Sequence, residues 1–476
     1  MTTRTRFAPS PTGYMHIGNL RTALYEYLIA KANGGDFLLR IEDTDQKRYV
    51  EGATDIIYST LKMVGMNWDE GPDIGGNYGP YVQSERKDLY APYAHKLVEL
   101  GGAHYCFCAE REKQLDEDGN EIIAKYEDPC KHIPLEEAKK RVAAGEPYVI
   151  RQTINKKGKS QYEDKVYGTI EIDYDELDEG VLLKSDGFPT YNFANVIDDH
   201  LMNVTHVVRG SEYLPSTPKY NLMYDTFGWK RPVYVHLPPV MKDATHKLSK
   251  RNGDASFQDL VAKGYLPEAI INYIALLGWN PGTEEEIFSL KDLEKIFSVE
   301  RLNKSPSIFD IVKLTWMNGI YIRNLSEEEF YEKALPYFAE LPSGIDTHAL
   351  ARALQPRIET LVQIHEQIAF IKQVPEYSTE LYVNKKMKTD IEVAKKALPL
   401  IKEVLSNQTE WTNDALFVAL KSLAEANEMK NGQILYPARI AFSGLETTPG
   451  GATELAVVLG KEECLRRIDA AIKKLV

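Results

Sequence analysis

The feature that most constrains the fold is a junction near the N-terminus where a strand passes directly into a helix. The β-compatible segment TRTRF, at 3–7, is followed by APSPTGYMHIGN, at 8–19, and then by a long segment of helical composition. Pro9 and Pro11 stiffen the exit from the strand, and Gly13 permits a tight turn. Such a junction predicts the first strand–helix unit of a parallel sheet.

Strands and helices alternate through the first hundred residues, and the pattern then changes twice. Near Cys106 the chain becomes polar and then rich in strands, which predicts an inserted domain. From Phe257 onward nearly every segment is helical. We therefore expect an α/β chain in which a doubly wound parallel sheet surrounds the insertion and two all-α regions follow, with limits at 1–103, 104–188, 189–256, 257–325 and 326–476.

Composition narrows the class of protein. The 476 residues are 43% hydrophobic and 27% charged, as in soluble globular proteins, and no apolar run approaches the roughly 18–20 residues of a membrane span. The N-terminus lacks the apolar core of a secretion signal, so a cytoplasmic chain without membrane attachment is expected. The net charge of −13 argues weakly against a nucleic-acid partner, although a local basic face can exist in an acidic chain.

Two short motifs are candidates for phosphate chemistry. His16 and Gly18 fall at the predicted start of a helix, where free N–H groups and the helix dipole suit a polyphosphate. In HKLSKR, at 246–251, Lys247 and Lys250 could clamp the charge of a transferring phosphoryl group. Taken singly, an ordinary Pro/Gly turn and a solvated basic loop explain the two motifs as well.

Taken together, the motifs resemble the two-part signature of class I aminoacyl-tRNA synthetases, and the chain closely resembles the bacterial glutamyl-tRNA synthetase family. RFAPSPTG, LRIEDTD, SDGFPTYNFANVIDDHLMNVTHVVRG and KLSKR carry the resemblance. It implies a Rossmann-type catalytic domain with an inserted acceptor-binding domain, followed by stem-contact and anticodon-binding helical domains. It also implies a monomer that uses ATP with Mg²⁺ to form glutamyl-adenylate and transfers glutamate to the terminal adenosine of tRNA(Glu), with tRNA bound before activation.

The resemblance also implies roles for individual residues. Asn19 stands where the general class I motif ends in histidine, so we expect no catalytic cation there. The expected ATP-binding residues are His16, Gly18, Asn19, Glu212, Lys247 and Lys250, of which His16, Gly18 and Lys250 are the catalytic set. The expected glutamate-binding residues are Arg6, Ala8, Ser10, Glu42, Tyr191, Asn195 and Arg209.

The chemistry of glutamate divides the amino-acid pocket. Glu42 suits the α-ammonium group, and Arg6 and Arg209 suit the two carboxylates, because arginine pairs with carboxylates bidentately. Which arginine takes the side-chain carboxylate stays open. Three alternatives also stay open: Glu42 as a surface or capping carboxylate, Arg209 in a structural ion pair with Asp198 or Asp199, and Tyr191 as a packing residue.

The cysteines predict a metal site. Cys106 and Cys108 form one close pair, Cys130 and His132 form another, and 21 residues separate the pairs. Three cysteines and one histidine make a closed tetrahedral zinc set, which a subset of the family carries. Free thiols beside an incidental histidine are the alternative, and Cys464 is expected to be a buried apolar residue.

Three rival functions remain at this stage. A glutaminyl-tRNA synthetase usually has Glu and Asn where this chain has Ser10 and Thr12. The short paralogue that glutamylates a modified tRNA base lacks the anticodon-binding domains. A zinc-dependent RNA-binding protein with an inactive nucleotide fold is the third. The sequence also leaves open whether glutamine tRNA is charged with glutamate as well.

Overall fold

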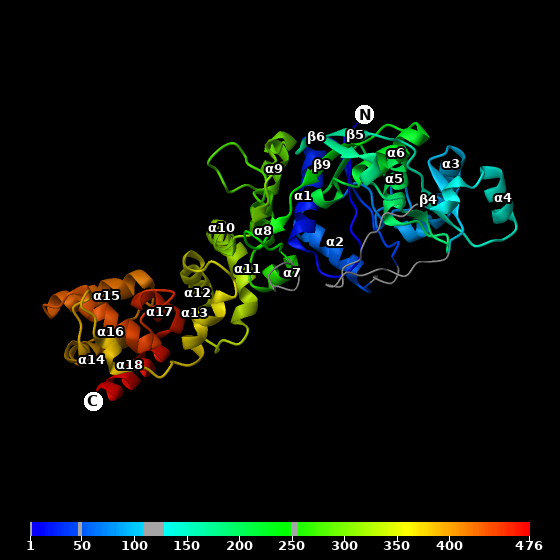
Figure 1. Ribbon diagram of the computed structural model, residues 1–476. Helices are drawn as coiled ribbons and strands as arrows, with labels where there is room; N and C mark the ends of the chain where they lie inside the picture. The colour runs from blue at the N-terminus through cyan, green and yellow to red at the C-terminus, as the bar shows by residue number, and fades with distance from the viewer. Residues whose placement is uncertain (1, 46–49, 109–127, 249–255) are drawn as a thin grey trace, which may run out of the picture. The chain divides into compact units, whose positions relative to one another are not determined.

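The computed structural model describes residues 2–45, 50–108, 128–248 and 256–476 (Figure 1). Its strands are β1 (Arg4–Phe7), β2 (Asp36–Leu39), β3 (Ala103–Cys106), β4 (Val149–Gln152), β5 (Lys159–Asp164), β6 (Gly168–Asp173), β7 (Val181–Leu183), β8 (His206–Gly210), β9 (Val233–Leu237), β10 (Val240–Met241) and β11 (Ser307–Ile308). Its helices are α1 (Ile17–Ala32), α2 (Ala53–Met63), α3 (Lys87–Glu99), α4 (Leu135–Ala143), α5 (Tyr191–Leu201), α6 (Thr217–Phe227), α7 (Phe257–Ala262), α8 (Pro267–Ala275), α9 (Leu290–Ile296), α10 (Ile311–Asn324), α11 (Glu327–Phe338), α12 (Thr347–Leu354), α13 (Gln363–Lys372), α14 (Ile391–Asn407), α15 (Asn413–Ala426), α16 (Asn431–Ser443), α17 (Ala452–Leu459) and α18 (Lys461–Leu475).

The expected parallel sheet lies in the first of two compact units, which comprises Met1–Asp259 and Ile270–Asp310. β1 pairs with β2 and β8 pairs with β9, and both pairs are parallel. Thr205, just before β8, donates from its N–H to the carbonyl of Arg4 at 2.9 Å, so β1 lies beside β8. The registers run from Arg4↔Asp36 to Phe7↔Leu39 and from His206↔Val233 to Gly210↔Leu237.

All four residues of β1 are buried, as expected for an interior strand of a sheet that helices cover. α1 follows β1 directly, and eleven of its residues are buried. A helix that is buried on most sides belongs in a core, so β1 and the body of α1 form the interior of this unit, while Ser10 and Tyr14 in the loop between them are exposed.

The strand-rich segment forms additional sheet structure in the same unit. β3, β4 and β7 make an antiparallel sheet in the order β3-β4-β7. β5 and β6 form an antiparallel pair, and the last residue of β5, Asp164, joins β9 in parallel opposite Tyr234. The inserted strands therefore bring Asp164 next to the central sheet.

The second compact unit comprises Leu260–Ala269 and Ile311–Val476 and consists of helices and short turns over its described residues. Several of its helices begin at polar caps whose side chains accept hydrogen bonds from the first turn, which satisfies otherwise free N–H groups. These caps are Ser326, Asp346, Asp390 and Thr412.

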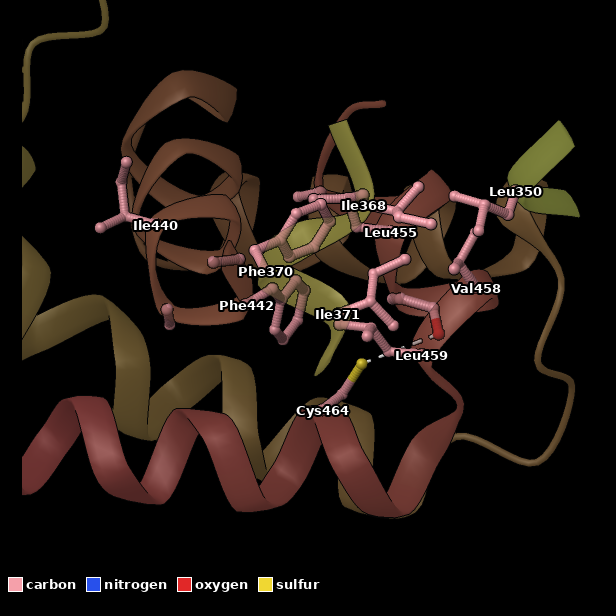
Figure 2. Packing of buried hydrophobic residues seen from close by; sticks show 14 of the residues in the cluster. Leu350, Ile368, Phe370, Ile371, Ile440, Phe442, Leu455, Val458, Leu459 and Cys464 are labelled. Carbon is pink, nitrogen blue, oxygen red and sulfur yellow. Dashed lines mark hydrogen bonds between the residues drawn. The ribbon is translucent and has the colours of Figure 1, made fainter. Parts of the chain in front are cut away.

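An apolar core holds this helical unit together. Figure 2 shows Phe370, Phe442 and Leu459 gathered beside α18, with Cys464 pointing toward them from that helix. Cys464 is fully buried and its thiol donates to the carbonyl of Ala456 at 3.7 Å, which confirms the expectation of a buried apolar residue. None of the described helices combines the length and apolarity that a membrane crossing requires.

Candidate active site

The junction between β1 and α1 shapes a helix start around His16. His16 is the N-cap of α1, and its Nδ1 accepts the N–H of Gly18 at 3.0 Å. If the ring is neutral, the proton lies on Nε2, which is then a donor. A Cβ on Gly18 would meet His16 Nδ1 at 3.2 Å, so glycine allows the ring to fold over the helix start.

The described residues downstream of the KLSKR segment contact this junction, and the first two residues of the segment, Lys247 and Leu248, close a turn with β10. Upstream, β10 leads into a tight reversal in which Leu248 donates to the carbonyl of Val240 at 3.1 Å. Downstream, Ser256 forms a β-bridge with His16. Gln258 Oε1 also accepts the N–H of Met15 at 3.1 Å. The structure thus places the segment from Ser256 onward beside the start of α1, while residues 249–251 of the motif lie outside the described residues.

The remaining expected ATP residues lie at the surface or outside the described ranges. Asn19 and Lys247 are exposed. Glu212 is exposed in the turn Ser211–Tyr213, and a Cβ on Gly210 would meet its carboxylate at 2.1 Å, so glycine permits this close approach. Lys250 lies outside the described residues.

Arg6 belongs to a buried network of opposite charges. Its Nε donates to Asp199 Oδ1 at 2.9 Å and its Nη1 to Glu26 Oε1 at 3.1 Å. Arg40 Nη1 donates to the same Asp199 oxygen at 2.8 Å. Burial favours the neutral form of Asp199, but the two arginines hold its pKa below the usual value. These contacts fix the guanidinium of Arg6 within the sheet core.

Glu42 is buried in the same network and is not a surface carboxylate. Its Oε1 accepts from Arg40 Nη2 at 2.8 Å, and Gln83 Nε2 lies at 3.5 Å from the same atom. Burial raises the pKa of Glu42 above its usual value despite the nearby Arg40 and Arg6. The backbone N–H of Glu42 donates to the carbonyl of Pro9 at 3.0 Å, which ties the carboxylate to the motif loop.

Arg209, on β8, is a buried cation with no carboxylate within ion-pair distance among the described residues. Its Nε donates to His236 Nε2 at 3.1 Å and its Nη2 to Thr217 Oγ1 at 2.8 Å, and both partners are neutral acceptors. Three aromatic rings face the guanidinium: Tyr213, Tyr220 and Tyr234, with centroids at 5.2, 4.7 and 5.5 Å. The guanidinium charge is therefore available to an anionic ligand.

The charges of Glu42 and Arg209 both act on the hydroxyl of Tyr191. Burial raises the pKa of Tyr191 well above its usual value, the Glu42 carboxylate adds to this effect, and Arg209 opposes it. Its ring packs against Tyr213 at a centroid distance of 5.6 Å. Asn195, one turn further along α5, donates from Nδ2 to the Tyr191 carbonyl at 2.6 Å.

Of the other expected residues, Ala8 is half-buried and Ser10 is exposed, both in the loop after β1.

The alternative of an ion pair between Arg209 and Asp198 or Asp199 is wrong. Asp198 accepts from Arg86 Nε at 2.7 Å, and Asp199 pairs with the network around Arg6. Both carboxylates are thus already neutralised by other arginines.

The three clustered cysteines come together with a carboxylate. Cys106 ends β3, Cys108 follows two residues later, and Cys130 lies in the short turn Pro129–His132. One ligand atom each from Cys106, Cys108, Cys130 and Asp128 lies within 4.8 Å of the other three. Cys108 Sγ and Cys130 Sγ are 3.7 Å apart. A tetrahedron with metal–sulfur bonds of about 2.3 Å has edges of about 3.8 Å, which agrees.

Asp128 takes the place in this group that the sequence predicts for His132. Asp128 caps the turn, and its Oδ1 accepts the N–H of Cys130 at 2.9 Å. Its Oδ2 is buried and lies 3.3 Å from Arg151 Nε and 3.4 Å from His104 Nε2, without hydrogen-bond geometry within the described chain. His132 stands at the opposite end of the same turn and is not among these four residues.

Comparison with known proteins places this geometry in a family. A family model described as "tRNA synthetases class I (E and Q), catalytic domain" matches residues 2–316, and one described as "Anticodon binding domain" matches residues 329–472. Glutamate–tRNA ligases of Clostridium tetani and of Clostridium botulinum strain Eklund 17B are 57% and 55% identical over 480 residues. These alignments cover 99% of this chain and 98% and 99% of the relatives.

Solved structures agree. A glutamate tRNA ligase from Elizabethkingia meningosepticum, crystallised with its amino acid, is 33% identical and superimposes with a TM-score of 0.87 over 100% of both chains. A glutamate-tRNA synthetase from Elizabethkingia anophelis, also 33% identical, gives 0.88 over 99% of this chain and 100% of that one.

The catalytic and anticodon-binding matches, on a fold with parallel strand pairs, define a class I aminoacyl-tRNA synthetase. The relatives identify the branch of this class as well. The chain belongs to the glutamate–tRNA ligases. The expectation of a class I fold and of this family is thereby confirmed, and the glutaminyl and short-paralogue rivals are not supported.

Sequence reasoning missed the partners of the site residues. Arg40, Asp199 and Gln83 surround Glu42 and Arg6, and His236 and Thr217 hold Arg209. The one local signal was a lone histidine in the apolar strand VYVHL, where a polar residue needs a buried partner.

Proposed function

We propose that the chain activates L-glutamate with MgATP and transfers it to tRNA(Glu), in a pocket built around Arg209. The observation that carries this proposal is the buried Arg209 guanidinium, which neutral groups fix and which has no carboxylate within ion-pair distance in the described part of the chain. A substrate carboxylate would supply the missing anion with bidentate geometry. Arg6, already held by Asp199 and Glu26, would use its remaining Nη2 for a second contact.

The other glutamate contacts follow from the charges around Arg209. Glu42, buried after β2 and hydrogen-bonded to the carbonyl of Pro9, would bind the α-ammonium group, and Tyr191, whose pKa both Glu42 and Arg209 affect, would line the same pocket. The side-chain amide of Asn195 donates to the backbone carbonyl of Tyr191 and so helps to hold Tyr191 in place. Ala8 and Ser10, in the loop after β1, would line the same space.

ATP would bind over the start of α1. His16 Nε2 and the N–H groups of the first helical turn would meet its phosphates, with Gly18 allowing close approach. Lys247 and Lys250 would stabilise the charge that develops on the α-phosphate as the glutamate carboxylate attacks it. No protein nucleophile takes part, so catalysis consists of positioning and electrostatic stabilisation. Asn19 and Glu212 would contribute contacts to the nucleotide.

The thiol cluster would hold a structural zinc ion. Three sulfur donors favour zinc, and the spacing of 3.7 Å between two of them fits its tetrahedral geometry. Cys106, Cys108 and Cys130 would supply three ligands, and Asp128, which belongs to the same group, would supply the fourth in place of the expected His132. Bound zinc would tie the polar segment that follows β3 back to the sheet.

The remaining regions would contact the nucleic acid. Residues 104–188 would bind the acceptor arm, 257–325 the stem and 326–476 the anticodon, with 1–103 and 189–256 forming the catalytic sheet. A cytoplasmic monomer is part of the same proposal.

The proposal predicts a selective defect when Arg209 is replaced. Arg209→Lys keeps the positive charge but loses the planar guanidinium that donates two parallel hydrogen bonds. The KM for glutamate in aminoacylation should therefore rise roughly 10- to 100-fold at saturating ATP and tRNA(Glu). The KM for ATP should change little. Arg231→Lys, in an exposed ion pair with Asp225, is the control. An unchanged KM for glutamate in Arg209→Lys would contradict the proposal.

A second candidate is an enzyme that also charges tRNA(Gln) with glutamate. The choice depends on anticodon contacts in the helical unit. Side-by-side charging of purified tRNA(Glu) and tRNA(Gln) decides between the two, because a discriminating enzyme leaves tRNA(Gln) uncharged.

A further inference from the structure

Two buried side chains lie behind Arg209 and belong to none of the proposed substrate contacts. His236 is on β9 and Asp164 ends β5, and neither side chain is exposed to solvent. His236 Nδ1 and Asp164 Oδ2 are 2.7 Å apart. The pairing of β5 with β9 places Asp164 at this position, so the inserted strands contribute directly to the surroundings of the pocket.

Asp164 fixes the tautomer of the histidine ring. Its Oδ1 accepts the N–H groups of Val166 and Tyr167 at 2.9 and 2.8 Å, and its Oδ2 accepts the N–H of His236 at 3.1 Å. Both oxygens therefore already face N–H donors, and the ring contact requires a proton on Nδ1. A neutral ring then has a bare Nε2, which acts only as an acceptor.

Arg209 uses this acceptor. Its Nε donates to His236 Nε2 at 3.1 Å, and its Nη2 donates to Thr217 Oγ1 at 2.8 Å. The Thr217 hydroxyl itself donates to the carbonyl of Tyr213 at 2.9 Å, which leaves its lone pairs for Arg209. Two neutral acceptors thus set the orientation of the guanidinium and leave its positive charge uncompensated.

We propose that His236, held in one tautomer by Asp164, is a positioning residue that orients Arg209 toward a carboxylate of the substrate. The proposal rests on the role proposed above for Arg209. Burial lowers the pKa of His236 and Arg209 adds to this effect, while Asp164 opposes it, so the neutral ring persists near neutral pH. A neutral ring is required, because an imidazolium would offer Arg209 a second donor and a second positive charge.

The test is steady-state aminoacylation of tRNA(Glu) by full-length variants. His236→Leu removes the acceptor and should raise the KM for glutamate roughly 10- to 100-fold, with the KM for ATP unchanged within about twofold. His236→Gln offers an oxygen to Arg209 and an amide to Asp164, so it should recover most of the loss. His206→Gln, whose ring contacts Thr205, is the matched control on β8 and should behave as the parent.

A double variant separates this inference from the proposed function. If His236 acts through Arg209, His236→Leu adds little to the defect of Arg209→Lys, whereas additive defects overturn the inference. A normal KM for glutamate in Arg209→Lys overturns the proposed function. A raised KM there, with a normal KM in His236→Leu, overturns only the positioning role.

A second variant covers the case in which His236→Leu does not fold. Asp164→Asn keeps the side-chain volume but replaces an acceptor with a donor, which permits the other tautomer and sets His236 Nε2–H against Arg209 Nε–H. It should raise the KM for glutamate while circular dichroism shows a folded chain. A folded Asp164→Asn with parental KM for glutamate overturns the inference.

Discussion

At the scale of single residues, the pocket combines a cation that pairs with no carboxylate among the described residues and a carboxylate whose ionised form is disfavoured by burial. Neutral groups fix Arg209, so its charge remains for a ligand. Glu42 is buried beside Arg40, and its pKa is raised above the usual value. A ligand group of opposite charge would stabilise the charged form of each side chain, which is typical of binding residues.

The raised pKa of Glu42 makes a prediction about stability. A carboxyl whose pKa is higher in the folded than in the unfolded state costs stability when ionised, and this cost is relieved as pH falls through the folded pKa. At pH 7, Glu42→Gln should therefore melt at the same temperature as the parent or at a higher temperature. Its KM for glutamate should rise strongly. Thermal melts beside aminoacylation kinetics check both parts. A lower melting temperature with an unchanged KM would show that Glu42 serves only the fold.

The sequence predicted candidate residues better than their partners. Arg6, Glu42 and Arg209 stand in motifs, so the resemblance selected them directly. Their partners Asp199 and His236 come from strands and helices distant in the chain. A local pattern carries no information on such pairing, which the strand order of the sheet decides.

At the scale of elements, the turn at Pro129–His132 decides how the thiols meet. It sets Cys130 beside the end of β3 and places Asp128 and His132 at its two ends. The spacing of cysteines predicted the cluster correctly, as three thiols do come together. It favoured His132 because an aspartate among many acidic residues of a polar segment gives no signal of its own.

The metal proposal predicts which substitution releases zinc. Asp128→Ala should lower the zinc content of the purified chain well below one per chain, while His132→Ala should retain it. Elemental analysis after dialysis against a chelator measures the difference, with Cys130→Ser as the control for a lost ligand. Loss of zinc from His132→Ala, with Asp128→Ala unaffected, would restore the histidine as the fourth ligand.

At the scale of the whole molecule, the chain divides into two compact units, and each unit is made of two separate stretches of sequence that alternate with those of the other. Periodicity predicted a helical C-terminal part, and the structure is helical there. It could not predict that Leu260–Ala269 joins the helical unit, because Leu266 and Ala269 are recruited by long-range packing into that core. The net charge of −13 was also a poor guide, since residues 329–472 match an anticodon-binding family.

The central claim, a pocket whose uncompensated arginine selects an anionic amino acid, is tested most directly by charging tRNA(Glu) with labelled glutamate and labelled glutamine in parallel. We propose that Arg209 takes the side-chain carboxylate, which is an amide in glutamine, so the enzyme should favour glutamate by roughly 100-fold or more in kcat/KM. Arg209→Lys should reduce this preference. Comparable charging with both amino acids, or a preference that survives in Arg209→Lys, would contradict the account.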